Sequence, residues 1–245
     1  MRIGVTERGD AGLDLSWSSK MNYVDGAILI TKNINEQFIR EVLKQDKPLI
    51  IHCTCTGWGG ATMEPNVPSY GTQLYNLEQL IVRGFPVENC VLRVDPIIPN
   101  EVGLCLLRNV LDYFVEFNMG VKRVRISIVD EYRHVKERML RNNVKPLYGD
   151  RMYPSSAQLQ LVANVLNEYE FTYELCAENF LANKLRNCEV LGCVSNKDLQ
   201  LMGLPIEDCF INPQNRKGCH CLSCKTELLT ERKQCAHKCV YCYWK

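Results

Sequence analysis

The sequence has no long apolar segment and almost no excess of charge of either sign. Its longest apolar runs, such as residues 26–30 and 49–51, have the length of a strand, far below the roughly 20 residues that a helix needs to span a bilayer. A transmembrane helix is therefore excluded, and we expect no membrane partner. A composition of 46% apolar and 23% charged residues with a net charge of +1 is typical of a soluble globular protein.

Several other signals are missing. We find no internal repeat, low-complexity tract or linker, which favours one domain. No signal peptide precedes the start Met1-Arg2-Ile3-Gly4. The 14 cysteines would indicate a disulfide framework in a small secreted chain, but 245 residues can bury a core without such links. We expect a cytoplasmic protein with reduced thiols.

Short β-rich runs alternate with amphipathic segments along the chain. The predicted strands are residues 2–6, 27–31, 49–54, 90–94, 123–128 and 171–176. The predicted helices are residues 35–44, 70–83, 103–118, 131–142 and 155–168. This alternation indicates βα units with right-handed crossovers, and hence an α/β fold whose parallel sheet is buried on both faces.

Six such units predict a partial or complete (β/α) barrel. A flat doubly wound sheet is the alternative, but the glycine-rich phosphate loop typical of that fold does not follow the first predicted strand. We expect residues 1–210 to form the barrel domain. Residues 211–245 should form a cysteine-rich segment that packs on it and binds a metal cluster.

Three cysteines near the end of the chain carry the strongest functional signal. Cys235, Cys239 and Cys242 have C-x3-C-x2-C spacing, and three thiolates on one tight loop can hold three irons of a 4Fe-4S cluster while the fourth iron stays open. The aromatic residue before the third cysteine would shield the cluster. The motif resembles the cluster loop of radical S-adenosylmethionine (SAM) enzymes, in which the amino and carboxylate groups of SAM fill the open site. In those enzymes the loop lies near the N-terminus of the barrel.

Zinc is the alternative metal for these residues. Cys219-His220-Cys221 and Cys224 lie just upstream, and tetrahedral zinc takes four Cys or His ligands from such short spacings. Zinc sites usually pair two C-x2-C units, whereas the terminal motif brings three cysteines and a spacing of three. We therefore favour an iron-sulfur cluster.

Positive charge is concentrated in two segments. Residues 122–151 contain nine Lys or Arg against four acids, and residues 214–245 contain seven against two. Such segments would suit an anionic substrate or nucleic acid. The simpler interpretation is a solvated helix face, which the spacing of Arg133, Lys136, Arg138 and Arg141 fits.

Polar residues gather where the predicted strands end. In a βα barrel these ends carry the functional groups, because their loops converge on one face. The terminal cysteines should cap that face. Individual residues also have simpler interpretations: Arg93 and Asp95 could neutralise one another, Glu7 and Asp10 could cap a helix, and His52 could be a hydrogen-bonded core residue. The residues in question are Glu7, Arg8, Asp10, Thr31, Lys32, Asn33, His52, Cys53, Thr54, Cys55, Arg93, Asp95, Ser127, Asp130, Glu174, Cys176 and Glu178.

The segment Gly57-Trp58-Gly59-Gly60 follows the third predicted strand and permits a turn that a side chain would block. With Glu64, it loosely resembles the glycine-rich loop of radical SAM enzymes that contacts the methionine amino group. Gly57, Gly59, Gly60 and Glu64 are thus candidate cofactor-binding residues. A plain tight turn before Pro65 and Pro68 is the alternative.

Several segments together resemble one bacterial family of unknown function with a C-terminal cysteine cluster similar to that of radical SAM enzymes. The resemblance implies an iron-sulfur barrel protein related to radical SAM and photoproduct-lyase-like enzymes, and it assigns no reaction. It rests on residues 56–59, Glu64-Pro65-Asn66-Val67-Pro68, Arg93-Val94-Asp95-Pro96-Ile97, 126–132, Cys176-Ala177-Glu178 and the region from Asn215-Arg216 through Cys242-Tyr243.

The family pattern also carries cysteines at Cys176, near Cys193, and at Cys219 and Cys221. The resemblance therefore implies a second cluster with four ligands, which would suit electron transfer. This chain departs from the pattern in its extra cysteines, which could replace a ligand in either site, and in a region between Cys221 and Cys235 that is about two residues longer. The extra cysteines are Cys53, Cys55 and Cys224. We expect Cys90, Cys105, Cys188 and Cys209 to be buried small hydrophobes.

Our first hypothesis is a radical SAM-type enzyme in which Cys235, Cys239 and Cys242 hold the catalytic cluster. One-electron reduction would cleave SAM to a 5'-deoxyadenosyl radical, and a reductant such as a ferredoxin or flavodoxin would supply the electron. Arg93, Asp95, Lys32 and Glu178 are the candidate catalytic-site residues that position the substrate, which could be nucleic acid or another anion. The alternative is a noncatalytic protein that holds zinc or an iron-sulfur cluster and binds a partner or nucleic acid through its basic C-terminal segment.

Overall fold

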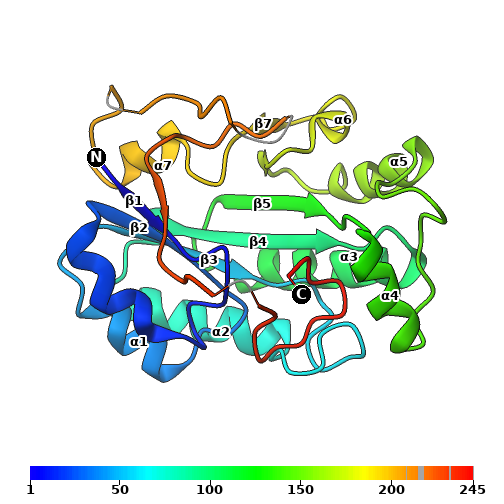
Figure 1. The fold of residues 1–245 in the computed structure, drawn as a ribbon, viewed down its shortest axis with the longest axis horizontal. Helices are drawn as coiled ribbons and strands as arrows, with labels where there is room; N and C mark the ends of the chain where they lie inside the picture. The colour runs from blue at the N-terminus through cyan, green and yellow to red at the C-terminus, as the bar shows by residue number, and fades with distance from the viewer. Residues whose placement is uncertain (208, 215–217, 232, 245) are drawn as a thin grey trace.

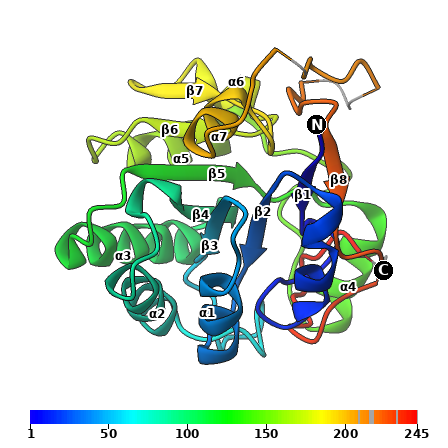
Figure 2. The same ribbon diagram turned by 90° about the vertical axis from the view of Figure 1, so that its left-hand side faces the viewer.

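The computed structural model describes residues 1–207, 209–214, 218–231 and 233–244. In these ranges the chain forms one sheet of eight parallel strands in the order β7-β6-β5-β4-β3-β2-β1-β8 (Figures 1 and 2). The strands are β1 Ile3–Val5, β2 Gly26–Thr31, β3 Leu49–Thr54, β4 Cys90–Ile97, β5 Arg123–Ile128, β6 Tyr173–Leu175, β7 Cys188–Val190 and β8 Lys225–Glu227.

Helices cover one face of the sheet and a shorter helix covers the other. Figure 2 shows α1, α2 and α3 on one side and α7 on the opposite side. The 3-10 helices are η1 Leu15–Tyr23 and η2 Val87–Asn89. The α-helices are α1 Glu36–Leu43, α2 Tyr70–Val82, α3 Glu101–Phe117, α4 Arg133–Arg141, α5 Ser156–Leu166, α6 Asn179–Ala182 and α7 Asn196–Leu201.

Strand residues alternate between two buried layers, because successive side chains in a strand point to opposite faces. Leu29 and Ile51 pack in the core under the main helices. Their neighbours Ile28 and Ile50 pack in a second core, together with Leu199 of α7. A sheet buried on both faces explains why the first strands read as continuous apolar runs.

The predicted α/β fold with a parallel sheet is confirmed, and all six predicted strands and five predicted helices have counterparts. The complete barrel is wrong: within the described ranges no strand pairing joins β7 to β8, so the sheet is open. The strand order also runs from β1 to β7 without the reversal that a doubly wound sheet requires.

None of the described helices combines the length and the apolar character that crossing a bilayer requires.

A buried network of charges links β5, β6 and α7. Arg123 Nε lies 2.7 Å from Glu174 Oε1, and Arg123 Nη2 lies 2.6 Å from Asp198 Oδ1. Arg125 Nη2 lies 2.8 Å from Glu174 Oε2. Burial by itself would raise the pKa of Glu174, but the charges of Arg125 and Arg123 lower it to about 2. Glu174 is therefore part of the interior. Its position near a predicted strand end had suggested a group at the functional edge of the sheet, and that prediction is wrong.

Replacing Glu174 with glutamine is expected to lower the free energy of unfolding by about 3–5 kcal/mol, because Arg123 and Arg125 would be left to share the buried charge of Asp198. Urea denaturation at pH 7 measures this. Glu168 provides the control: it pairs with Arg108 at 2.7 Å, but both side chains are roughly half exposed, so Glu168→Gln should cost less than about 1 kcal/mol.

The pH dependence gives a second readout of the same prediction. The pKa of Glu174 falls from its ordinary value of 4.5 to about 2 on folding, so its contribution to stability is complete above pH 4.5 and is lost as the pH falls toward 2. The stability difference between wild type and E174Q should narrow over that interval. A difference that stays constant between pH 7 and pH 3 would contradict the network.

Candidate functional site

A cavity of about 590 Å³ lies at the C-terminal ends of the parallel strands. Its walls come from the loops after these strands and from residues 233–244, which we call the terminal loop. Figure 1 shows this loop, in red, beside α4. All seven cysteines predicted to bind metal line this one cavity, although they come from distant parts of the chain: Cys176, Cys193, Cys219, Cys221, Cys235, Cys239 and Cys242.

The terminal loop makes two tight turns around its cysteines. The Lys238 N–H donates to the Cys235 carbonyl at 3.1 Å, and the Cys242 N–H donates to the Cys239 carbonyl at 3.1 Å. Lys238 has a left-handed backbone with φ of 53°, which closes the first turn. These turns bring the three cysteines of the motif to the same side of the cavity.

Burial raises the pKa of the thiols of Cys235, Cys239 and Cys242. At Cys239 the charge of Lys32 acts in the opposite direction. Since the thiolate is the form that binds metal, a bound cation would have to displace these protons.

The second cysteine group consists of Cys176, Cys193, Cys219 and Cys221. Sγ of Cys176 lies 3.2 Å from Sγ of Cys193, and the Cys193 N–H donates to Sγ of Cys221 at 3.1 Å. Hydrogen bonds lower the pKa of Cys219 to about 6, mainly through Cys221, and that of Cys221 to about 7, mainly through Cys176 and Cys193. Both thiols thus have a pKa near or below neutral pH, and the thiolate is the form that binds a metal.

A glycine makes this gathering of cysteines sterically feasible. A Cβ on Gly192 would lie 2.5 Å from the backbone N and Cα of Cys221, so a side chain there would push the segment before β8 away from the end of β7. The Leu222 N–H donates to the Val194 carbonyl at 3.1 Å across the same contact. Close packing at Gly192 thus brings Cys221 to Cys193.

No three His, Cys, Asp or Glu side chains in the described ranges already surround one point as the ligands of a single metal ion would. An iron-sulfur cluster makes a different demand, because each thiolate binds its own iron at a separate corner.

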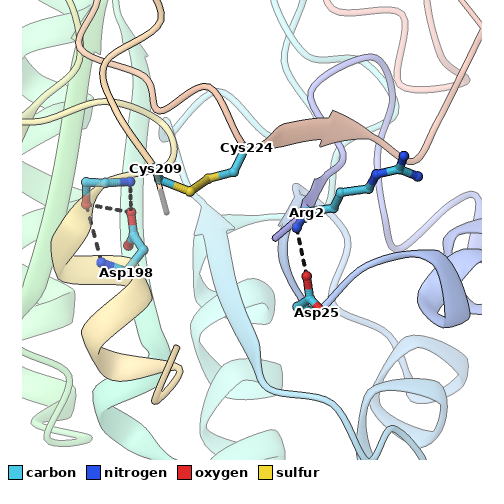
Figure 3. The surroundings of a disulfide bond; sticks show 6 residues. Arg2, Asp25, Asp198, Cys209 and Cys224 are labelled. Carbon is cyan, nitrogen blue, oxygen red and sulfur yellow. Dashed lines mark hydrogen bonds between the residues drawn. A yellow bond between two sulfur atoms is a disulfide. The ribbon is translucent and has the colours of Figure 1, made fainter. Parts of the chain in front are cut away.

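Two other cysteines form a disulfide that the sequence did not predict. Cys209 and Cys224 are bonded to each other (Figure 3). Cys209 is thus not a buried thiol, and Cys224, just before β8, is not available to replace a cluster ligand. The expectation that all thiols are reduced is wrong for this pair.

The remaining cysteines differ in exposure. Cys53 and Cys55 are buried on and just after β3 with their sulfurs 3.7 Å apart, outside the cavity lining. Cys90 is buried as predicted, and Cys188 is partly buried. Cys105 on α3 is exposed, so its prediction as a buried residue is wrong.

Arg93 and Asp95, at the end of β4, form an ion pair in the cavity wall. Mutual neutralisation, the simpler interpretation of these residues, is therefore what the structure shows. Both side chains are still about one-fifth exposed, at 21% and 22%. They can contact a molecule in the cavity as a pair that presents both charges.

Glu178 lies behind the cavity wall. It accepts hydrogen bonds from the Ser127 hydroxyl at 3.0 Å and the Ile128 N–H at 2.9 Å. Burial is the main cause that raises its pKa to about 7. The side chain can therefore gain or lose a proton near neutral pH, and it holds the end of β5 in place.

Lys32 and Glu64 form a buried ion pair, with 2.8 Å between Lys32 Nζ and Glu64 Oε1. Glu64 also accepts a hydrogen bond from the Tyr241 hydroxyl. Both residues thus contact or face the terminal loop. This was not expected for Glu64, which we had predicted as a ligand for SAM.

The three candidate cofactor-binding glycines lie outside the cavity lining, and packing accounts for them. A Cβ on Gly57 would lie 2.7 Å from Leu106 Cβ, and one on Gly59 would lie 2.1 Å from the Pro68 carbonyl. Gly60 has φ of 79° in a turn whose N–H donates to the Glu64 carbonyl. These positions support the tight-turn alternative.

His52 is buried on β3, and neither of its ring nitrogens has a hydrogen-bond partner among the described residues. Burial is the first cause that lowers its pKa, and the charge of Arg125 adds to it. Of the two interpretations of His52, a hydrogen-bonded core residue or a proton carrier, the structure supports burial in the core but not the hydrogen bonds, and the ring is a neutral part of the interior.

Sequence reasoning missed that His237 is buried and hydrogen-bonded to Asp10. Burial by itself would lower the pKa of this histidine, but the hydrogen bond and charge of Asp10 raise it. Asp10 had been considered as a helix cap. The one available signal was the position of His237 between Cys235 and Cys239 of the motif.

The fold and the site define an α/β protein with a sequential parallel sheet and a cysteine-lined cavity at its C-terminal edge. The chain belongs to the family described as Domain of unknown function (DUF1848), whose model matches residues 15–244. This supports the predicted membership of a family of unknown function. Comparisons with curated proteins and with solved structures gave no significant match. Asn215 and Arg216, which contributed to the predicted resemblance, lie outside the described residues.

Proposed function

We propose that this protein is an iron-sulfur enzyme of the radical SAM type, in which Cys235, Cys239 and Cys242 ligate a catalytic 4Fe-4S cluster with one open iron. The observation that carries the proposal is the C-x3-C-x2-C motif in the wall of a cavity at the C-terminal edge of a parallel sheet. With SAM bound, the cluster would supply the one-electron cleavage that yields a 5'-deoxyadenosyl radical.

The sheet supports this proposal through its order of strands. From β1 to β7 each strand lies beside its predecessor in the sequence, which is the winding of a (β/α) barrel. We interpret the open sheet as a partial, radical-SAM-like barrel whose strands β1 to β7 come from residues 1–210, with β8 of the segment 211–245 added beside β1. The segment 211–245 would contribute the cluster ligands and pack on it.

The second cysteine group would hold a cluster with all four irons ligated. Such a cluster has no open iron and suits electron transfer. Cys176 and Cys193 approach each other from β6 and β7, and Cys221 completes the contact from the segment before β8. A cytoplasmic ferredoxin or flavodoxin would be the source of electrons.

The side chains in the cavity wall would bind and orient the substrate. The Arg93–Asp95 pair offers a cation to an anionic group and a carboxylate to a donor. Glu178, behind the wall, would act through Ser127 and the end of β5 that it holds, and it can hold a proton near neutral pH. A cavity of about 590 Å³ is in the range of small-molecule sites, which favours a small anionic substrate over a nucleic-acid duplex.

A zinc protein without catalytic activity is the second candidate. The observation that favours it is the contact among four thiols, two of which have a pKa lowered to about 6 and about 7, because tetrahedral sites with four cysteine ligands are typical of structural zinc. Metal analysis after anaerobic purification discriminates between the two proposals. Zinc without iron would favour the second.

SAM is expected to change the electron paramagnetic resonance spectrum of the reduced, reconstituted protein, because it would occupy the open iron. Turnover should also release 5'-deoxyadenosine without added substrate. S-adenosylhomocysteine, which lacks the cleavable sulfonium bond, is the matched control and should release none. If the spectrum of fully reconstituted protein does not change when SAM is added, the enzyme proposal is contradicted.

A further inference from the structure

Two of the buried side chains that lie between the terminal cysteines are hydrogen-bonded to buried carboxylates. His237 lies between Cys235 and Cys239, and Tyr241 lies between Cys239 and Cys242. The exposed fractions of the two side chains are only 2% and 7%. Cys239 thus has a buried, anchored neighbour on each side.

His237 is held at both ring nitrogens. Its Nε2 lies 3.0 Å from Asp10 Oδ2, and its Nδ1 lies 3.0 Å from the Asn66 carbonyl oxygen. The Asn66 side chain returns to the same turn, because its Nδ2 donates to the Ala236 carbonyl at 2.8 Å. The first half of the motif is therefore fixed to the loop after β1 and to the loop after β3.

Asp10 is the centre of this arrangement. Its Oδ1 accepts from the Gly12 N–H at 2.9 Å and from the Thr31 hydroxyl at 2.7 Å. Its Oδ2 accepts from the Lys32 N–H at 2.6 Å in addition to His237. A buried carboxylate with this many donors is rigidly placed, so the histidine is held by a fixed partner.

The second half of the motif is anchored through Tyr241. Its hydroxyl donates to Glu64, which pairs with Lys32 Nζ at 2.8 Å. The same Nζ lies 5.6 Å from the centroid of the Tyr241 ring. Lys32 therefore joins the two halves: its N–H binds Asp10 and its ammonium group binds Glu64.

We propose that Asp10, Lys32 and Glu64 are positioning residues that hold the terminal loop in the shape a cluster requires before iron is bound. His237 and Tyr241 are the side chains through which they act. The proposal assigns Lys32 and Glu64 a role different from substrate or SAM binding. It rests on the proposed function only in that the three cysteines are cluster ligands.

The test uses metal-free protein and the alkylation of Cys239 by iodoacetamide, measured by mass spectrometry. Cys239 is buried, whereas Cys105 is exposed and serves as the internal standard in each sample. His237→Gln and Tyr241→Phe should each increase the alkylation rate of Cys239 relative to Cys105 by about tenfold, because each removes one buried hydrogen bond to a carboxylate. Lys238→Gln, an exposed change in the same loop, should leave the rate unchanged.

General loss of stability would give a different pattern. Cys90 lies in the main core, so its alkylation would rise together with that of Cys239 if a variant unfolded, whereas loosening of the loop affects Cys239 alone. After reconstitution, the two variants should also lose iron to a chelator faster and show a changed paramagnetic resonance spectrum of the terminal cluster. Tyr241→Phe is the milder change and keeps the test valid if H237Q does not fold.

The outcomes separate this proposal from the proposed function. If wild type binds iron and both variants protect Cys239 as well as wild type does, the anchoring proposal is wrong and the enzyme proposal stands. If the variants expose Cys239 but wild type takes up no iron, the three residues anchor the loop without preparing it for a cluster, and the enzyme proposal is wrong.

Discussion

Replacing Cys239 with alanine should remove the terminal cluster, so that the iron content of reconstituted protein falls by about four atoms per chain. The loop offers three thiolates for one cluster, and the two thiolates left in the variant are not enough to hold the cluster. Cys239 is the middle ligand and the most deeply buried of the three, and it lies between the anchored His237 and Tyr241. We therefore expect no other side chain of the loop to take its place.

The same variant should release no 5'-deoxyadenosine above background, because cleavage of SAM depends on the open iron. Iron and sulfide analysis together with chromatography of the products measures both effects. Cys105→Ala, on the exposed face of α3, is the control and should keep wild-type iron and activity. Undiminished iron in C239A would disprove the assignment of the terminal loop as a cluster site.

The sequence predicted the central strands well and the edge strands not at all. Residues 27–31 and 49–54 are apolar because they are buried on both faces of a parallel sheet, and this pattern is visible without a structure. β7 and β8 have three residues each, and each contains charged residues. They are strands because a neighbour in the sheet pairs with them, which no local pattern reveals.

The candidate site residues were predicted from residue type and spacing. The structure added contacts between residues that are far apart in the sequence. The C-x3-C-x2-C spacing is local and could be recognised directly. The hydrogen bond between Asp10 and His237 joins residues 227 positions apart, and the disulfide between Cys209 and Cys224 depends on how the segment before β8 returns to the sheet. Such contacts are set by topology, so composition and spacing could not predict them.

The last prediction concerns the second cysteine group. Replacing Cys219 and Cys221 together with alanine should remove a second set of about four irons and also loosen the terminal loop. Cys221 accepts the Cys193 N–H and lies next to the Gly192 contact, so metal at this group would tie the segment before β8 to the end of β7. β8 in turn pairs with β1, whose following loop carries Asp10, the anchor of His237.

Because metal binding and folding of this segment would be coupled, the double variant should lose more iron than one cluster contains and should be cleaved by protease within its last thirty or so residues. Iron analysis and limited proteolysis with mass spectrometry measure both effects. Cys188→Ala, a partly buried cysteine on β7 outside the cavity lining, is the matched control and should change neither. If the double variant keeps its full metal content and its protease resistance, Cys219 and Cys221 bind no metal and the group is a set of packed thiols.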